Sequence, residues 1–228
     1  MKAVILAAGQ GTRIHSVHGE RPKCLIEVDN SMILDHQLDA LSIAGINDVA
    51  IVVGYEKEQI INHVTNRKPS KAQRIHFIEN PAFVITNNIY SLWLALEWLR
   101  DDGFIVLNAD VIFDADVLDS AVRTSAPISM IVDPLWRDET MKVISHGDRV
   151  LQMSKKISRD QFSGTYIGIT VFSKAIQNRF FEKISALISA GYVNDFFNVA
   201  VQELVDEGTS VTRAPSGWPG PKPMTLQT

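Results

Sequence analysis

Apolar runs of strand length alternate with stretches of helical periodicity along this chain of 228 residues. A short, wholly apolar run is typical of a buried strand, and apolar residues at helical spacing are typical of an amphipathic helix. The apolar runs predict strands at residues 3–7, 49–53, 74–78, 104–107, 166–172 and 210–213. The helical spacings predict helices at residues 32–44, 56–64, 88–99, 114–123, 174–190 and 194–207. Strands and helices that alternate in this way predict an α/β sandwich.

One stretch departs from this alternation. Residues 128–132, 141–145 and 149–153 predict three shorter strands with no helix between them. Their mixed polar and apolar character indicates greater exposure than in the other strands. We interpret this stretch as a β-rich flap.

The C-terminal segment differs from the rest in its proline content. It holds Pro219, Pro221 and Pro223, and prolines at this density exclude a helix or a central strand. The remainder of the chain contains no internal repeat and no linker rich in glycine or serine. We therefore expect one domain over residues 1–213 and an irregular, proline-rich tail over residues 214–228.

The composition excludes several classes of protein. Apolar residues make up 46% of the chain and charged residues 21%, a balance typical of a folded domain. A net charge of −4 argues against a protein that binds nucleic acid through bulk positive charge. No apolar run reaches the length of about 18 residues that a membrane helix needs. The single cysteine, Cys24, excludes an intrachain disulfide and suits a reducing compartment. Taken together, the charge, the apolar runs and the cysteine count predict a cytoplasmic protein with no nucleic-acid or membrane partner.

A glycine-rich segment follows the first predicted strand. Gly9 and Gly11 lie among small residues, which lets the backbone approach a phosphate so that successive N–H groups face its oxygens. Arg13 adds a cation at the same place, and Lys23 follows at a rigid turn after Pro22. The two glycines alone are equally compatible with a tight connection after a strand. They match neither a dinucleotide-binding fingerprint nor a P-loop.

The segment as a whole resembles the N-terminal signature of the nucleotidyltransferases that activate sugar phosphates and phosphorylated alcohols, through Leu6-Ala7-Ala8-Gly9-x-Gly11-x-Arg13 and then Pro22-Lys23-x-Leu25. The resemblance implies a Rossmann-like three-layer sandwich with a mixed, mostly parallel central sheet. It also implies that Arg13 and Lys23 are catalytic, because they would hold the triphosphate and stabilise charge at the phosphorus under attack. The nucleotide-binding residues that it implies in this segment are Leu6, Ala8, Gly9, Gly11, Thr12, Arg13 and Lys23.

Asp110 ends a buried apolar strand, the position at which α/β folds place their ligand crevice. A lone Asp after a strand is more often a helix cap or a turn residue. The run from Asn108 to Asp114 nevertheless resembles the strand-end motif of the same family, which implies that Asp110 binds Mg²⁺. Magnesium prefers carboxylate and phosphate oxygens. We interpret Asp114 as the cap of the following helix, with a metal contact as the alternative.

The helix that ends at Leu99 opens on polar side chains. Asn87 or Asn88 is expected to cap it, and simple capping explains the amides there. Together with Lys155 and Tyr166-Ile167-Gly168-Ile169, however, Asn88-x-Tyr90-Ser91 resembles the cytidylyltransferase branch, which includes phosphocholine cytidylyltransferases and enzymes that activate aminoalkylphosphonates. The resemblance implies that Ser91 lies near the cytosine base and Asn88 near the nucleotide or the acceptor. It also implies that Lys155 holds acceptor phosphate, with Lys156 as the second candidate.

An acceptor that carries an ammonium group needs aromatic faces and a carboxylate. The candidates are Asp133, Trp136, Tyr192 and Asp195, with Asp133-Pro134-Leu135-Trp136 as the best local cluster. Tyr90 is also expected among the substrate-binding residues. Each also has a structural explanation, since tryptophans usually lie in cores and an Asp can cap the helix at residues 194–207. The histidines show no metal-binding spacing, and Cys24 is expected to be a small, half-buried residue and not a nucleophile.

The implied reaction joins CTP to a small phosphorylated or phosphonate acceptor and releases pyrophosphate. The acceptor phosphate is already a nucleophile at neutral pH, so alignment and charge neutralisation would suffice for catalysis. A uridylyl- or thymidylyltransferase that acts on sugar 1-phosphates, and a non-catalytic nucleotide-binding protein, are the alternatives. A homodimer is one candidate assembly.

The C-terminal segment departs from the family pattern. Family members usually close with a strand, a Trp and a second metal-binding Asp, whereas no Asp or Glu follows Glu207 in this sequence. Three explanations compete. The chain is truncated or frame-altered with weak activity, the site is rewired around Asp133 or Asp195, or the protein binds nucleotide without catalysis.

Overall fold

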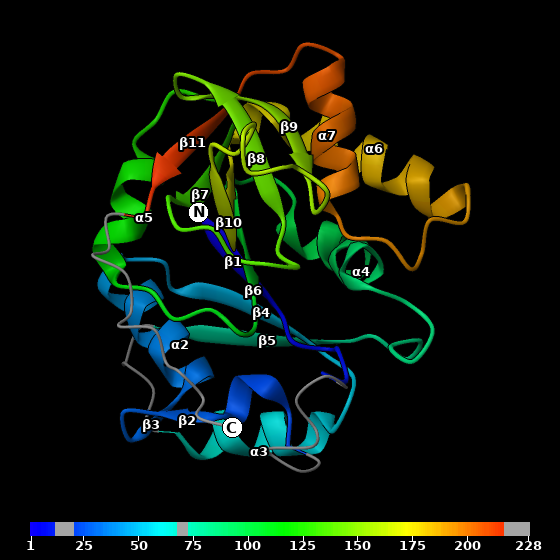
Figure 1. The fold of residues 1–228 in the computed structure, drawn as a ribbon. Coiled ribbons are helices and arrows are strands. Elements are labelled where there is room, and N and C mark those ends of the chain that lie inside the picture. Colours follow the sequence, from blue (N-terminus) through cyan, green and yellow to red (C-terminus); the bar gives the residue numbers. More distant parts are fainter. Residues whose placement is uncertain (12–20, 68–72, 217–228) are drawn as a thin grey trace.

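In the computed structural model, residues 1–11, 21–67 and 73–216 are described, and they form an α/β fold around one large mixed sheet (Figure 1). The described strands of this sheet follow the order β5-β4-β1-β6-β10-β7-β11-β9-β8. A small hairpin of β2 (Glu27–Val28) and β3 (Ser31–Met32) lies apart from it. The expectation of an α/β fold with a mixed sheet is therefore confirmed. The expectation that the sheet is mostly parallel is wrong, because four of its described pairings are parallel and five are antiparallel.

Four strands make up the parallel half of the sheet: β5 (Arg74–Glu79), β4 (Asp48–Val53), β1 (Lys2–Leu6) and β6 (Phe104–Asn108). The apolar residues of β4, β1 and β6 are buried because helices cover the two faces, so these three strands read as continuous apolar runs. β5, at the edge of the sheet, alternates polar and apolar residues, and none of its residues is fully buried. The predicted positions of all four strands are confirmed to within two residues.

The other five strands are β10 (Gly164–Phe172), β7 (Ile128–Asp133), β11 (Val211–Pro215), β9 (Arg149–Ser154) and β8 (Lys142–His146). We call them the antiparallel half, because all their pairings are antiparallel except that of β11 with β7, which is parallel. β10 runs antiparallel to both β6 and β7 and so joins this half to the parallel half. Its first residues also pair with β8.

Two expectations about this half differ from the structure. β7 is buried at every position, because it lies between β10 and β11, so the expected exposure holds only for parts of β8 and β9. β11 runs to Pro215, two residues beyond the expected domain boundary, and Ser216 N donates to Val132 O at 3.2 Å. The remaining tail, residues 217–228, lies outside the described residues.

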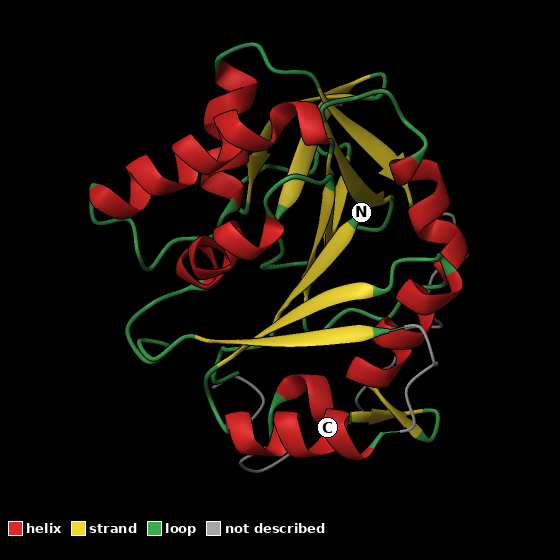
Figure 2. Ribbon diagram, turned by 180° about the vertical axis from the view of Figure 1, so that it is seen from behind, coloured by secondary structure: helices red, strands yellow, loops and turns green. Residues whose placement is uncertain are grey.

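Helices cover both faces of the sheet (Figure 2). On one face, α2 (Ile33–Ile43), α3 (Lys57–Asn66) and α5 (Ala115–Val122) pack on one set of alternate strand residues, together with the short helix η1 (Lys23–Leu25). On the other face, α4 (Asn88–Leu99), α6 (Gln177–Ser189) and α7 (Asn198–Asp206) pack on the opposite set. The turn η2 (Lys174–Ile176) precedes α6.

α7 begins four residues later than its periodicity predicts. The preceding segment is held at the start of α4, where Asn87 N donates to Val193 O at 2.9 Å and Ile89 N donates to Asp195 O at 3.3 Å. Its carbonyls therefore accept from a neighbouring helix and do not begin a helix of their own.

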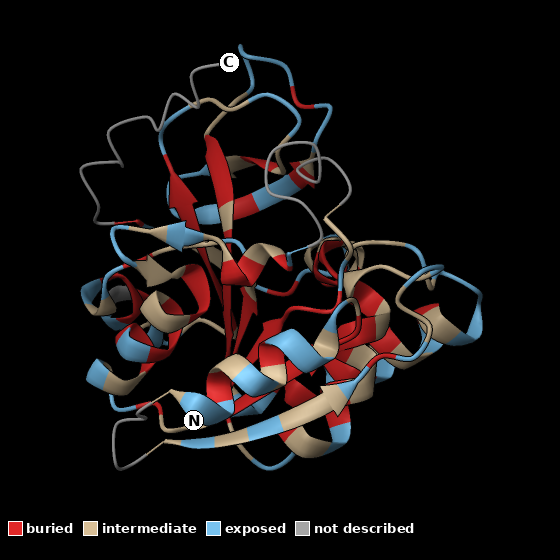
Figure 3. Ribbon diagram, turned by 90° about the horizontal axis from the view of Figure 1, so that it is seen from below, coloured by how far each residue is buried: buried red, intermediate tan, exposed pale blue. Residues whose placement is uncertain are grey.

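Buried residues follow the strands and the inner helix faces (Figure 3). None of the described helices is long and apolar enough to cross a membrane.

Candidate active site

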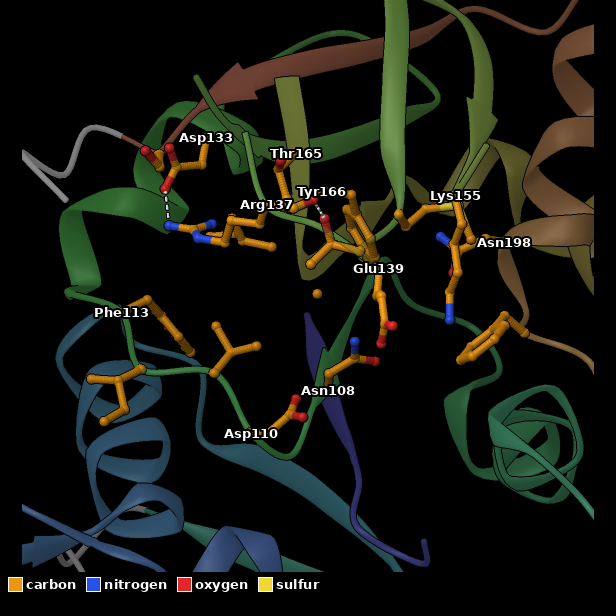
Figure 4. Close-up of a pocket in the computed structure, with 18 of the residues that line it drawn as sticks. Asn108, Asp110, Phe113, Asp133, Arg137, Glu139, Lys155, Thr165, Tyr166 and Asn198 are labelled. Atoms are coloured by element: carbon orange, nitrogen blue, oxygen red, sulfur yellow. Dashed lines mark hydrogen bonds and ion pairs between the residues drawn. The ribbon is translucent and has the colours of Figure 1, made fainter. Parts of the chain in front are cut away.

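Two adjoining cavities lie where the parallel strands β1 and β6 end. The smaller has a volume of about 210 Å³ and the larger about 570 Å³. The smaller lies against the glycine-rich loop and the start of α4. The larger lies against the antiparallel half of the sheet (Figure 4). The residues that line both cavities are Lys23, Asn108, Asp110 and Phe196.

The glycine-rich loop forms one wall of the smaller cavity. Its backbone is fixed to β4 and the turn after it, because Ala7 N donates to Val52 O and Ala8 O accepts from Tyr55 N. Gly11 has a φ of +66°, and a Cβ there would lie 2.8 Å from the Lys23 side chain. A glycine is therefore needed for Lys23 to pass over the loop. Leu6, Ala8, Gly9 and Gly11, four of the residues predicted to bind the nucleotide, line this cavity.

Thr12 and Arg13, which are predicted to bind the nucleotide, lie outside the described residues. Lys23 lies within them, at the start of η1, where Pro22 O accepts from Leu25 N at 2.9 Å. Lys23 Nζ lies 3.5 Å from Asp110 Oδ2, and both side chains are partly exposed. An exposed pair of this kind contributes little to stability. Its importance is that it places one cation and one carboxylate in the wall between the two cavities.

The turn that carries Asp110 is held from both sides. Gln37, fully buried on α2, donates from Nε2 to Asn108 O at 2.8 Å and to Val111 O at 2.7 Å. On the other side Gly168 of β10 has a φ of +93°, and a Cβ there would lie 2.8 Å from Asn108 Nδ2. Gln37 was not predicted as a site residue, although an amide on the apolar face of a predicted helix is a signal in the sequence.

Buried amides organise the other wall of the smaller cavity. Asn80 is 1% exposed, and its Nδ2 donates to Thr86 Oγ1 and to Ser91 Oγ, both at 3.1 Å. Asn88 Oδ1 accepts from Phe197 N at 2.9 Å. Asn88 and Ser91 line the cavity, which supplies the amides and hydroxyls that can read the edge of a base.

The helix cap and Tyr90 lie elsewhere. Of the two predicted caps, Asn87 is the residue at the N-cap, and its Oδ1 accepts from Asn88 N at 2.8 Å. The ring of Tyr90 packs against Trp93 with 5.4 Å between centroids, and Tyr90 is not among the residues that line either cavity.

Only part of the expected acceptor site comes together in the larger cavity. Lys155 lines it, with Nζ 4.5 Å from the centroid of the Phe196 ring, and Asp133 lines its far side. Lys156, Tyr192 and Asp195 do not line either cavity. Of these three residues, Asp195 contacts α4, where its backbone carbonyl accepts a hydrogen bond from Ile89 N.

Trp136 also lies away from both cavities. Its ring contacts Lys142 Nζ at 4.6 Å and the Arg159 guanidinium at 5.1 Å, and its Nε1 donates to Asp138. Lys142 and Arg159 thus already occupy the Trp136 ring, which a choline-type ammonium group would need to contact.

Cys24 is more deeply buried than expected. It is 1% exposed, and burial, with a further contribution from the Asp110 charge, raises the pKa of its thiol to about 12. A thiol with so high a pKa is neutral at physiological pH and a poor nucleophile. The proximity of Lys23 in sequence therefore does not activate it.

Asp110 is the carboxylate that a magnesium ion could use at the wall between the cavities. Mg²⁺ is commonly bound through one or two carboxylates plus substrate phosphates, and Asp110 beside a cavity lined by a glycine-rich loop and Lys23 fits that pattern. No group of three or more His, Cys, Asp or Glu residues that could hold a metal occurs in the described parts of the chain. Asp114 occupies the N-cap position of α5, although its side chain makes no capping hydrogen bond.

Neither candidate replacement for a second metal ligand lies beside Asp110. Asp133 Oδ2 accepts from Arg137 Nη2, and Figure 4 places this pair across the cavity from Asp110. Asp195 does not line either cavity.

Comparison with known proteins identifies the family. The model of the MobA-like NTP transferase domain matches residues 3–191. The chain belongs to this family. A CTP:phosphoglutamine cytidylyltransferase of Campylobacter jejuni is 27% identical over 192 residues, which are 76% of this chain and 73% of that protein. A CMP-5'-(3-aminopropyl)phosphonate synthase of Streptomyces rubellomurinus is 33% identical over 64% of this chain, although the match spans only 24% of that protein.

The structure of the CTP:phosphocholine cytidylyltransferase from Streptococcus pneumoniae has the same fold as this NTP transferase. Its TM-score is 0.71 at 24% identity, and the match covers 94% of this chain and 89% of that one. The chain is thus a nucleotidyltransferase in sequence and in fold, and the expected relationship to the cytidylyltransferases is confirmed.

Proposed function

We propose that this protein transfers a cytidylyl group from CTP to a small phosphorylated or phosphonate acceptor and releases pyrophosphate. The observation that carries the proposal is the Lys23–Asp110 pair, 3.5 Å apart in the wall common to both cavities. A triphosphate in the smaller cavity and an acceptor in the larger would meet at this wall, where a cation can neutralise charge on the phosphate being transferred.

The chain's own residues would bind and align both substrates. Backbone N–H groups of the glycine-rich loop would face the triphosphate oxygens, and Lys23 would hold the α-phosphate. An acceptor oxygen then forms a bond to the α-phosphorus while the bond to the bridging oxygen of pyrophosphate breaks. Mg²⁺ bound through Asp110 and phosphate oxygens would supply further charge neutralisation. The acceptor phosphate is an anion at neutral pH, so no general base is needed.

Nucleotide choice would come from the start of α4. Ser91 is 4% exposed, and its Oγ accepts a hydrogen bond from Asn80 Nδ2, so the hydroxyl is held in one position in the smaller cavity. A fixed hydroxyl and the nearby amide of Asn88 are suited to a cytosine edge, which presents both donors and acceptors. On the acceptor side, Lys155 would hold the acceptor phosphate.

Three relationships support cytidine over other nucleotides. The relatives and the structural neighbour described above carry CTP or CMP in their names, with phosphoglutamine, an aminopropylphosphonate and phosphocholine as the other component. All three are small phosphorus-bearing molecules.

The test is pyrophosphate release with each of the four ribonucleoside triphosphates and with dTTP, in the presence of Mg²⁺, against phosphocholine, 2-aminoethylphosphonate, 2-amino-3-phosphonopropionate and glucose 1-phosphate. We expect release with CTP and an amine-bearing acceptor. Release only with UTP or dTTP and glucose 1-phosphate would establish a sugar-activating enzyme instead. No release from any pair, alongside CTP binding measured by calorimetry, would indicate a nucleotide-binding protein without catalysis.

A further inference from the structure

The larger cavity extends well beyond the Lys23–Asp110 pair. Arg137 and Asp133 line its far side, across the cavity from Asp110 (Figure 4). Asp133 is the last residue of β7 and is 3% exposed. Its Oδ1 accepts from Leu135 N and its Oδ2 from Arg137 Nη2, both at 2.7 Å. A buried carboxylate on a central strand thus fixes the position of an arginine in the cavity wall.

This arrangement leaves Arg137 suited to a second anion. A guanidinium has five N–H donors in a rigid plane, and the bond to Asp133 Oδ2 uses one of them. The Arg137 side chain is 37% exposed and lines the cavity. Arginine held in one orientation by a carboxylate can bind a further carboxylate through two parallel hydrogen bonds.

The cavity wall also carries charges of both signs. Lys155, whose Nζ lies 4.5 Å from the centroid of the Phe196 ring, lines it, and Glu139 points into the cavity toward Asn108 (Figure 4). Glu139 is thus a carboxylate in the same cavity as the cations of Arg137 and Lys155. An acceptor with a phosphate, an ammonium group and a carboxylate would match a wall of this kind.

We propose that Arg137, oriented by Asp133, binds a carboxylate of the acceptor, so that the acceptor is a phosphorylated or phosphonate amino acid and not a simple amino alcohol. The ammonium group of this acceptor faces Glu139. The inference rests on the proposed cytidylyl transfer, because it places the acceptor phosphate at the Lys23 end of the same cavity.

Matched phosphonates test the inference, since each pair differs only in one carboxylate. The pairs are 2-amino-3-phosphonopropionate with 2-aminoethylphosphonate, 2-amino-4-phosphonobutyrate with 3-aminopropylphosphonate, and 2-amino-5-phosphonopentanoate with 4-aminobutylphosphonate. Binding is measured by calorimetry and turnover by pyrophosphate release with CTP. We expect at least one carboxylate-bearing member to bind about tenfold or more tightly than its partner, as a charge-assisted pair allows.

Two arginine variants locate the effect. Arg137→Met should remove the preference for the carboxylate while leaving the binding of the carboxylate-free partner unchanged, and Arg137→Lys should restore part of it. Arg159→Met is the matched control, because Arg159 lies on the Trp136 ring and does not line either cavity. It should keep the preference in full.

The outcomes separate this inference from the proposed function. Equal or weaker binding of all three carboxylate-bearing members would overturn the inference, even if pyrophosphate release is rapid. An Arg137→Met variant that keeps the preference would overturn it as well. Preferential, Arg137-dependent binding without any turnover would uphold the inference and contradict the proposed cytidylyl transfer.

Discussion

The two halves of the sheet build their cavities in different ways. The smaller cavity lies at the ends of parallel strands, and its wall comes mainly from the parallel half: the loop at residues 6–11, the start of η1, residues 80–91 and the turn at residues 108–110. The larger cavity draws its wall from loops and strands of the antiparallel half that are far apart in sequence, including the segment around Arg137, the segment around Gly168 and Asn198. Under the proposed assignment, the nucleotide would be bound by short motifs that follow the parallel strands, and the acceptor largely by segments that only the antiparallel half brings together.

The largest expected effect is at the point where the halves meet. Lys23→Ala should lower kcat by about a hundredfold or more, because the lost cation acts on charge that develops in the transition state. Steady-state pyrophosphate release measures this. Lys57→Ala, which removes an exposed lysine paired with Glu79 at 2.7 Å, is the control and should retain normal turnover. A Lys23→Ala variant with near-normal turnover would remove Lys23 from the catalytic machinery.

Gly168 tests the packing between the halves. Gly168→Ala should destabilise the fold by about 3 kcal/mol, because the new Cβ combines a positive φ with overlap against Asn108 and Val111. Gly147→Ala is the matched control: its φ is also positive, at +58°, but a Cβ there meets nothing within 4 Å. Its cost should be about 1 kcal/mol. Equal midpoints in urea denaturation for the two variants would mean that the contact between β10 and the Asp110 turn is unimportant.

Gln37 tests how the Asp110 turn is positioned. Gln37→Met keeps the length of the side chain but removes both hydrogen bonds to the turn. We expect the Mg²⁺ concentration at half-maximal turnover to rise about tenfold, since small displacements of a catalytic group have large effects. Gln59→Met on the exposed side of α3 is the control. A loss of stability with an unchanged Mg²⁺ dependence would assign Gln37 a structural role alone.

The smallest expected effect concerns Cys24. Burial raises the pKa of its thiol to about 12, so the folded protein should not react with a disulfide reagent at pH 8, whereas the unfolded protein should. The raised pKa also contributes stability that is complete below the ordinary thiol value of about 8.5 and is lost as the pH rises toward 12. Urea denaturation at pH 7 and pH 10 should therefore show a larger decrease for the wild type than for Cys24→Ala. Rapid labelling of the folded protein would contradict the burial of Cys24.

Most of the fold could be predicted because its elements are defined by local periodicity. Each predicted strand and helix has a counterpart in the structure, and the errors fall where long-range contacts decide. β7 is wholly buried because β10 and β11 flank it, and Asn198 starts α7 late because the preceding carbonyls accept from α4. Neither contact leaves a periodic signal in the sequence.

The site residues that belong to short sequence motifs could be predicted, whereas those placed by tertiary contacts could not. Lys23, Asp110 and Ser91 belong to short motifs, and the structure brings all three to the smaller cavity. Trp136 was proposed from residue type, but its ring contacts Lys142, at the start of β8, and Arg159, in the loop between β9 and β10. Arg137 was missed for the converse reason, since its place in the cavity depends on a buried partner and on the course of the loop after β7.

The central claim is that the smaller cavity binds CTP and the larger cavity binds the acceptor. The most direct test is to measure the KM values of two variants for both substrates. Ser91→Ala should raise the KM for CTP roughly threefold to tenfold and leave the KM of the best acceptor unchanged, because one hydrogen bond in the smaller cavity is lost. Arg137→Met should do the reverse, raising the acceptor KM and leaving that for CTP unchanged. If both variants raise the same KM, or if each raises both equally, the two cavities do not bind separate substrates and the account is wrong.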